Sequence, residues 1–184
     1  MSSLNEVSFK RVFISYLPLT FLFVSVFNDF DFNYLKIENF SFNFAYILIF
    51  YWTLRNPDRL GYLAIFFAGI INDVVIAIPL GISSLCYLLL CSVTAYMRNI
   101  TLNPNFVKDW FSFLFVIILI NSVQVITLDL IFLLDINYMR YLNNTGFTFL
   151  FYPAFFVFFN SLSTKISKYK NDYTKFRYQK VRRL

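Results

Sequence analysis

Apolar residues run in long blocks along this chain rather than on one face in every third or fourth position. A helix crosses the roughly 30 Å hydrocarbon layer of a membrane with about 20 residues, or somewhat fewer where flanking Lys and Arg reach the interface. The blocks therefore predict an all-α integral membrane bundle. We place its six transmembrane helices at 12–27, 40–54, 60–78, 80–97, 110–134 and 147–162.

The third and fourth predicted helices come from one apolar stretch, 60–97, in which Asp73 is the only charged residue. We divide it at Pro79-Leu80-Gly81, because proline and glycine end helices. Two helices joined by so short a turn form a hairpin. Strands of a membrane β-barrel would alternate apolar and polar residues, which these blocks do not.

The distribution of charge predicts the orientation. The sequence is 59% hydrophobic and 14% charged, and short loops rich in Lys and Arg stay in the cytoplasm. With both termini cytoplasmic, all of the 16 Lys and Arg except Lys36 and Arg140 lie on the cytoplasmic side. We therefore expect a multi-pass protein with an even number of spans, forming a single domain over 1–184.

A basic tail, 163–184, follows the last predicted span. We expect it to lie on the anionic lipid of the cytoplasmic surface, where each cation contributes about 1 kcal/mol. Binding of a cytoplasmic protein partner is the alternative. We do not expect nucleic acid as a partner, because the aromatic residues, 22% of the chain, belong to lipid-facing helices rather than to a base-stacking surface.

Residues typical of an enzyme are scarce. The chain has no His, so catalytic triads and zinc sites lose their usual participant. Its four glycines form no phosphate-binding loop, and Cys86 and Cys91 fit helix packing. We expect no enzymatic activity, no catalytic residue, no cofactor and no metal.

Polar residues within the predicted spans are the remaining candidates. A carboxylate near the centre of a membrane helix costs about 2.5 to 3.5 kcal/mol, so Asp73 should face the bundle interior or an outer cleft and have hydrogen-bond donors. Gly61, Ala64, Ala68 and Asn72 fall on one face of the same helix, with Gly69 toward Asp73. Small residues allow helices to approach closely, so this face predicts a packing seam.

The fifth predicted helix carries Asn121, Gln124 and Asp129. Asn121 and Gln124, or backbone groups freed where Pro79 ends its helix, are the donors we expect for Asp73. Asp73 and Asp129 lie at similar depth, and three interpretations stay open: both carboxylates reach interfacial water or an amide partner, they form a pocket or partner-docking site, or they form a catalytic aspartate pair. Catalysis is the least favoured, since nothing else of such a site is present.

Three segments carry a resemblance to a known family: Tyr51-Trp52-Thr53-Leu54-Arg55-Asn56-Pro57-Asp58-Arg59-Leu60-Gly61, then Gly69-Ile70-Ile71-Asn72-Asp73, then Pro79-Leu80-Gly81. They resemble the rod shape-determining protein MreD of bacteria, which has an aromatic end to one span, a short basic loop with proline, and a following span with a glycine, two apolar residues and an aspartate. Pro153 in the last span also fits. At Ala77-Ile78 the chain departs from the family, in which a glycine often precedes the turn.

The resemblance implies a non-enzymatic component of the bacterial inner (plasma) membrane that supports cell shape and lateral peptidoglycan synthesis. Its expected partners are an MreC-like bitopic protein, the peptidoglycan glycosyltransferase and transpeptidase of lateral wall growth, and membrane lipid. Self-association is also compatible with the sequence. The candidate partner-binding or structural residues are Gly69, Asn72, Asp73, Pro79, Gly81, Asn121, Gln124 and Asp129.

The resemblance also implies a bundle similar to the substrate-binding subunits, or S-components, of energy-coupling-factor transporters. The alternative function is therefore a membrane subunit that binds a vitamin or another small molecule. A binding pocket in such a subunit should open to the outside near Asp73 and Asp129.

The charge distribution makes the topology testable with reporter fusions. Fusions after Leu54, Met97 and Leu184 should report the cytoplasm, and fusions near Asp31 and Asn143 should report the exterior. A fusion after Leu184 that reports the exterior would contradict the arrangement of six spans.

Overall fold

In a computed structural model the chain is described at residues 16–27, 41–100, 105–134 and 136–181, without the side chains of Asp58 and of 165–181. These residues form helices and turns and contain no strand, which confirms the predicted all-α class. Residues 12–15 of the first predicted span, residue 40 of the second and 182–184 of the tail lie outside the described residues. The elements are a helix at Tyr16–Phe27, α2 (Phe44–Arg55), the 3-10 turn η2 (Pro57–Arg59), α3 (Tyr62–Val75), α4 (Ile82–Ile100), α5 (Phe106–Ile126) with its π-helical continuation η3 (Thr127–Ile131), and α6 (Tyr138–Val181).

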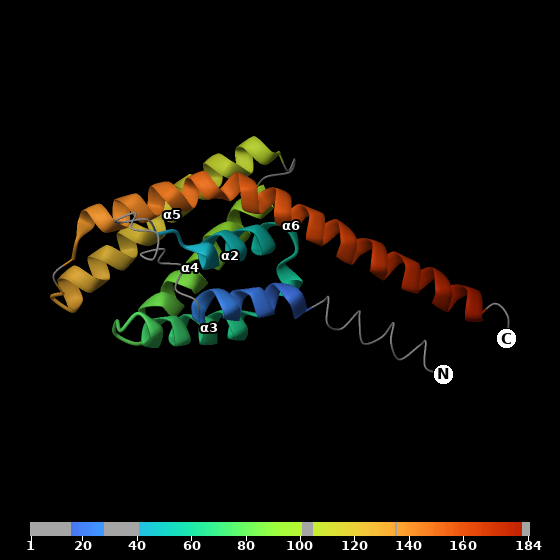
Figure 1. Ribbon diagram of the computed structural model, residues 1–184, viewed down its shortest axis with the longest axis horizontal. Helices are drawn as coiled ribbons and strands as arrows, with labels where there is room; N and C mark the ends of the chain where they lie inside the picture. The colour runs from blue at the N-terminus through green and yellow to red at the C-terminus, as the bar shows by residue number, and fades with distance from the viewer. Residues whose placement is uncertain (1–15, 28–40, 101–104, 135, 182–184) are drawn as a thin grey trace.

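Helix α2 forms the centre of the bundle (Figure 1), with α4 and α6 packed against it. Every residue from Phe44 to Thr53 is buried. A helix that is apolar on all sides must be enclosed by other helices, and the sequence of α2 has this character. Its position sets the arrangement of its neighbours.

Aromatic side chains join α2 to α5 and α6. The ring of Phe50 lies 5.0 Å from that of Phe113 and 5.8 Å from that of Tyr152, and the rings of Phe113 and Tyr152 stack at 4.6 Å. Each such pair contributes about 0.5 to 1.5 kcal/mol beyond its buried area. Phe50, Phe113 and Tyr152 thus form an aromatic core that connects three helices.

Helices α3 and α4 form the hairpin expected from the Pro-Leu-Gly sequence, and its closest contact is at Gly69. A Cβ atom on Gly69 would lie 2.5 Å from the backbone nitrogen of Ser84, so any larger residue would force the helices apart. Ala68 is also buried at this contact. The predicted seam is wrong at Gly61, which lies at the start of α3 with nothing within 4 Å of a Cβ atom.

Helix α6 differs most from the sequence prediction, because it begins at Tyr138 rather than near 147. The side chain of Asn137 accepts hydrogen bonds from the backbone N–H groups of Met139 and Arg140, which starts the helix. The polar residues that follow stay helical because they bond to the bundle: the Asn144 amide donates to Ser41 at 2.8 Å, and Thr148 accepts from the backbone N–H of Asn43 at 2.9 Å.

At its other end, α6 continues as a helix through the basic segment that we predicted as a tail, and its last turns extend beyond the remaining helices (Figure 1). Among the described residues, two helical segments are long and apolar enough to cross a membrane by length and composition, namely Phe106–Ile131 and Tyr138–Thr164. The helices at Tyr16–Phe27, Phe44–Arg55 and Tyr62–Val75 are apolar but shorter. The bundle is thus compatible with a membrane protein.

The close contact of α3 and α4 predicts the effect of Gly69→Ala. The added methyl group meets the Ser84 backbone, and overpacking of this kind costs about 1 to 3 kcal/mol. Gly146→Ala is the matched control, because a Cβ there meets nothing within 4 Å and alanine favours the interior of α6 by up to about 1 kcal/mol. We expect unfolding in mixed detergent micelles to show a loss of stability for Gly69→Ala alone. Equal stability of the two variants would contradict the close approach.

Candidate functional site

The carboxylate of Asp73 joins the end of α3 to the start of α4. Its two oxygens accept hydrogen bonds from the backbone N–H groups of Gly81, at 2.6 Å, and Ser83, at 2.8 Å. Asp73 is fully buried. N–H groups in the first turn of a helix lack partners within the helix, and the positive end of the helix dipole favours an anion there. Asp73 therefore caps α4 from outside that helix.

The turn between the two helices needs unusual backbone angles. Gly81 has φ +102°, which glycine adopts without steric strain, whereas Ala77 has φ 55°, where a Cβ atom is unfavourable. Ala77 is one of the two positions at which the chain departs from the MreD pattern. Pro79 lies between Ala77 and Gly81 and belongs to neither α3 nor α4. The hydrogen bonds of Asp73 hold this turn in place.

The remaining predicted site residues bond elsewhere. Asn72 donates to the Ser83 hydroxyl at 2.9 Å, Asn121 donates to the Thr145 hydroxyl at 2.6 Å, and Gln124 accepts from the Tyr46 hydroxyl at 3.1 Å. The expectation that Asn121 or Gln124 serves Asp73 is therefore wrong. Backbone groups do serve it: the N–H of Gly81, in the turn after Pro79, and the N–H of Ser83, in the first turn of α4.

Asp129 lies in the π-helical segment η3 and is half-buried, and it accepts a hydrogen bond from the Tyr138 hydroxyl at 3.1 Å. The hydrogen bonds of Asp73 and Asp129 thus go to separate partners, α4 for one and the start of α6 for the other. This arrangement gives neither carboxylate a side-chain amide as a donor. It provides no shared proton of the kind a catalytic aspartate pair uses.

A pocket of about 480 Å³ opens at the end of the bundle where these residues gather. Every described helix contributes an end to it: the last residues of Tyr16–Phe27, α3 and α5, and the first residues of α2, α4 and α6. Consecutive helices therefore run in opposite directions. The lining residues include three of the predicted site residues, Asn72, Asn121 and Gln124, but neither Asp73 nor Asp129.

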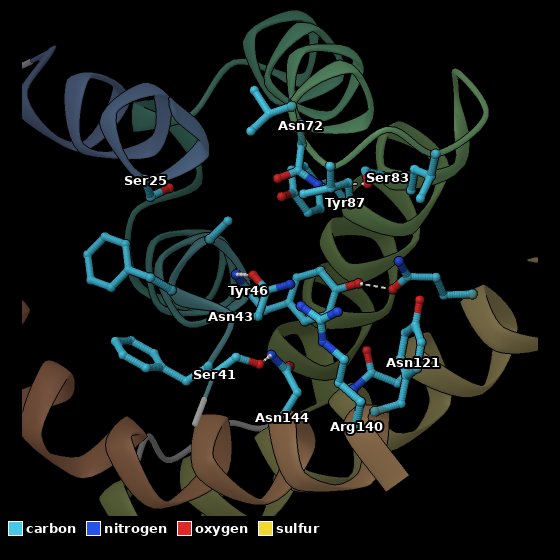
Figure 2. A pocket seen from close by; sticks show the side chains of 18 residues that line it. Ser25, Ser41, Asn43, Tyr46, Asn72, Ser83, Tyr87, Asn121, Arg140 and Asn144 are labelled. Carbon is cyan, nitrogen blue, oxygen red and sulfur yellow. Dashed lines mark hydrogen bonds between the residues drawn. The ribbon is translucent and has the colours of Figure 1, made fainter. Parts of the chain in front are cut away.

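Hydrogen bonds between helices hold the pocket wall together (Figure 2). Tyr46 reaches across the centre of the view, and its bond to Gln124 connects α2 to α5. The bond from Asn72 to Ser83 connects α3 to α4, and Asn144 of α6 bonds to Ser41 just before α2. Arg140 extends from α6 toward Tyr46. The polar groups of the wall are thus oriented by neighbouring helices.

The opposite end of the bundle has different chemistry. Arg55, at the end of α2, donates to the Asp109 carboxylate in the first turn of α5 at 2.7 Å, and its guanidinium lies 5.4 Å from the centre of the Phe156 ring. Helix α5 begins at Phe106, after the cap residue Asn105, rather than at the predicted 110. Its first turn therefore includes Lys108 and Asp109, and the ion pair with Arg55 compensates the charge of Asp109.

Sequence reasoning missed Tyr46, Arg140 and Asn144 as pocket residues. Tyr46 lies in an apolar block and has an amphipathic side chain that also fits helix packing, and the two others lie in a polar stretch between two predicted spans. Asn137, a good helix N-cap residue ahead of the segment, was the signal that could have identified it as helical.

The arrangement offers binding chemistry in the form of amides, hydroxyls and one guanidinium. Among the described residues no group of three or more Cys, Asp or Glu side chains is placed to hold a metal ion. No protein-family model, curated protein or solved structure matches this chain. The geometry and the sequence pattern therefore carry the functional argument.

The geometry of Asp73 predicts that Asp73→Asn is destabilising. Both carboxylate oxygens accept backbone hydrogen bonds, and an amide would turn its NH2 group toward one of these N–H donors, at a cost of about 1 to 3 kcal/mol. In Asp129→Asn, the matched control, the amide oxygen still accepts from Tyr138, so we expect a change within about 0.5 kcal/mol. The free energy of unfolding in mixed micelles measures both. Unchanged stability of Asp73→Asn would show that the cap is not needed.

Proposed function

We propose that this chain is a non-enzymatic adaptor of the bacterial inner membrane, similar in role to MreD. It would support cell shape and lateral peptidoglycan synthesis by binding an MreC-like bitopic protein and wall-synthesis proteins. One hydrogen bond carries the proposal: the Asp73 carboxylate accepts from the backbone N–H of Gly81 across the turn. This bond joins two of the segments that resemble MreD. The aspartate and the Leu-Gly pair of the MreD-like pattern thus act as one unit.

The proposal includes a multi-pass bundle of six spans with both termini in the cytoplasm. The alternating direction of consecutive helices supports this topology, as does the length of the two longest apolar segments. Helix α2 has 12 residues, about 18 Å at a rise of about 1.5 Å per residue. It is short for a membrane, but it is enclosed by other helices, so lipid does not set its length.

A surface beside the turn suits a helical partner. Leu80 is 68% exposed at the tip of the turn. Below it runs a shallow apolar groove of about 400 Å³ along α4, and its lining residues are Phe66, Gly81, Leu85, Leu88, Leu89 and Ser92. Membrane helices associate where small residues allow close approach, and Gly81 and Ser92 supply small residues at the two ends of the groove. We assign this groove to the membrane helix of the MreC-like partner.

Filling the groove tests the assignment. Ser92→Phe should lower recovery of the MreC-like protein at least about tenfold, equivalent to about 1.4 kcal/mol, in affinity purification from native membranes. Ser122→Phe is a matched control, because both serines are exposed and donate to the carbonyl of the residue four positions earlier in their helices. Both variants should reach normal membrane levels.

The same affinity purification distinguishes the adaptor role from the role of a vitamin-binding transporter subunit. Co-purified wall-synthesis proteins would support the adaptor, and only Ser122→Phe should maintain rod-shaped growth in cells depleted of the native chain. Equal recovery of the MreC-like protein with both variants would remove the groove from the proposal. Co-purified transporter ATPases in place of wall-synthesis proteins would favour the vitamin-binding subunit.

A further inference from the structure

Helix α6 carries one apolar stripe from the bundle into its basic extension. The residues alternate three and four positions apart, as at the first and fourth places of a heptad repeat. They are Tyr152, Phe155, Phe159, Leu162, Ile166, Tyr169, Tyr173 and Phe176. Helix α6 is continuous over all of them, and positions at this spacing fall on one face of a helix. We call this face the α6 stripe.

The first half of the α6 stripe is the face by which α6 packs in the bundle. Tyr152 and Phe159 are fully buried, and Phe155 and Leu162 pack against the core. The ring of Phe44 in α2 lies 4.8 Å from that of Phe155 and 5.8 Å from that of Phe159. The heptad pattern therefore marks a face that contacts other helices.

The second half of the α6 stripe belongs to the extension, 165–181, whose last turns lie beyond the remaining described helices (Figure 1). A helical segment of this length spans about 25 Å. The sequence from Ala154 to Leu184 contains no Pro or Gly, the residues at which helices usually kink. In a bundle that spans a membrane, such an extension leads away from the bilayer rather than along its surface.

We propose that the second half of the α6 stripe docks an acidic helix of a protein partner as a coiled coil. Helices whose apolar residues repeat every 3.5 positions pack with these residues facing each other. The inference goes beyond the adaptor role and does not depend on it, because the apolar groove along α4 and the extension of α6 are separate surfaces.

The charges beside the stripe determine the kind of partner. Between 165 and 177, three of the four heptad positions that flank the stripe are cationic, namely Lys165, Lys170 and Arg177, and the fourth is Asp172. Flanking charges of a coiled coil select a partner of opposite sign. A partner helix with Glu or Asp at the matching positions is therefore favoured, and a second copy of this cationic segment is disfavoured.

Anionic lipid has the same sign of charge as an acidic helix but a different geometry. A helix that binds a lipid surface lies in the plane of the membrane, with a broad apolar face toward the acyl chains. The extension instead continues α6, and its apolar residues follow the narrow spacing of a helix-packing face. These two features favour a helical partner over the lipid surface.

The test measures binding of synthetic peptides to the full chain in phosphatidylcholine nanodiscs that hold one chain each, so that a second copy cannot compete. The probe peptide has four heptads, with Leu at the stripe positions and Glu at the flanking positions. A second peptide has the same composition in scrambled order, and a third has Lys in place of Glu. We expect fluorescence anisotropy to show binding of the acidic heptad peptide at least about tenfold tighter than that of either control.

Variants connect binding to the α6 stripe. Tyr173→Ala removes a stripe residue, and Tyr178→Ala is the matched control, because position 178 lies about 140° around the helix from 173. Alanine favours a helix at both positions, so a difference between the variants does not come from loss of the helix. We expect the affinity to fall about tenfold for Tyr173→Ala and to stay unchanged for Tyr178→Ala. Equal affinities of the two variants, or equal binding of the scrambled peptide, would overturn the coiled coil.

Two other occupants of the stripe give distinct results. Peptide binding that appears only after deletion of residues 2–15 would assign the stripe to the N-terminal segment of the chain itself. A fluorescent dye on Phe176→Cys reports lipid contact, since Cys86 and Cys91 are buried away from the labelling reagent. We expect the same emission in phosphatidylglycerol and phosphatidylcholine nanodiscs. A blue shift in phosphatidylglycerol, binding only after the deletion, or no binding of the acidic heptad peptide would overturn the proposal.

Discussion

The buried carboxylate of Asp73 is the constraint on which the pocket end of the bundle depends. An ionised carboxylate in an apolar interior costs several kcal/mol unless charge-assisted hydrogen bonds compensate it. Here two backbone N–H groups from the start of α4 provide that compensation. The bonds hold the turn after α3, and Ser83 then lies where Asn72 can reach it. One side chain thus organises a turn, the start of a helix and part of the pocket wall.

Close approach at Gly69 makes this cap geometrically possible. Because Gly69 has no side chain, the backbone of Ser84 can lie against α3 one helical turn before Asp73. The same approach allows the Ser84 hydroxyl to donate to the backbone carbonyl of Phe66 at 2.9 Å. Packing of the hairpin and capping of α4 are therefore one arrangement, in which a larger residue at 69 would displace the donors from the carboxylate.

The polar side chains at the two ends of the bundle differ in kind and in their partners. At one end, Arg55 and Asp109 neutralise each other between α2 and α5 beside the Phe156 ring. At the other, amides and hydroxyls from all the described helices surround an open pocket with Arg140 as its charged member. The enclosed apolar helix α2 separates these regions. An ion pair thus joins helices at one end, and hydrogen bonds among amides and hydroxyls join them at the other.

The sequence by itself determined the all-α class, the approximate positions of the apolar helices, and the need for a compensated carboxylate beside a Pro-Leu-Gly turn, because hydropathy, helix breaking and desolvation act over a few neighbouring residues. Only the tertiary structure decided which donors Asp73 receives and that Arg55 pairs with Asp109. These contacts depend on how helices are placed around α2. Tyr46 and Gln124 show the reason most clearly, since they are 78 positions apart in the chain and meet only when α2 and α5 pack side by side.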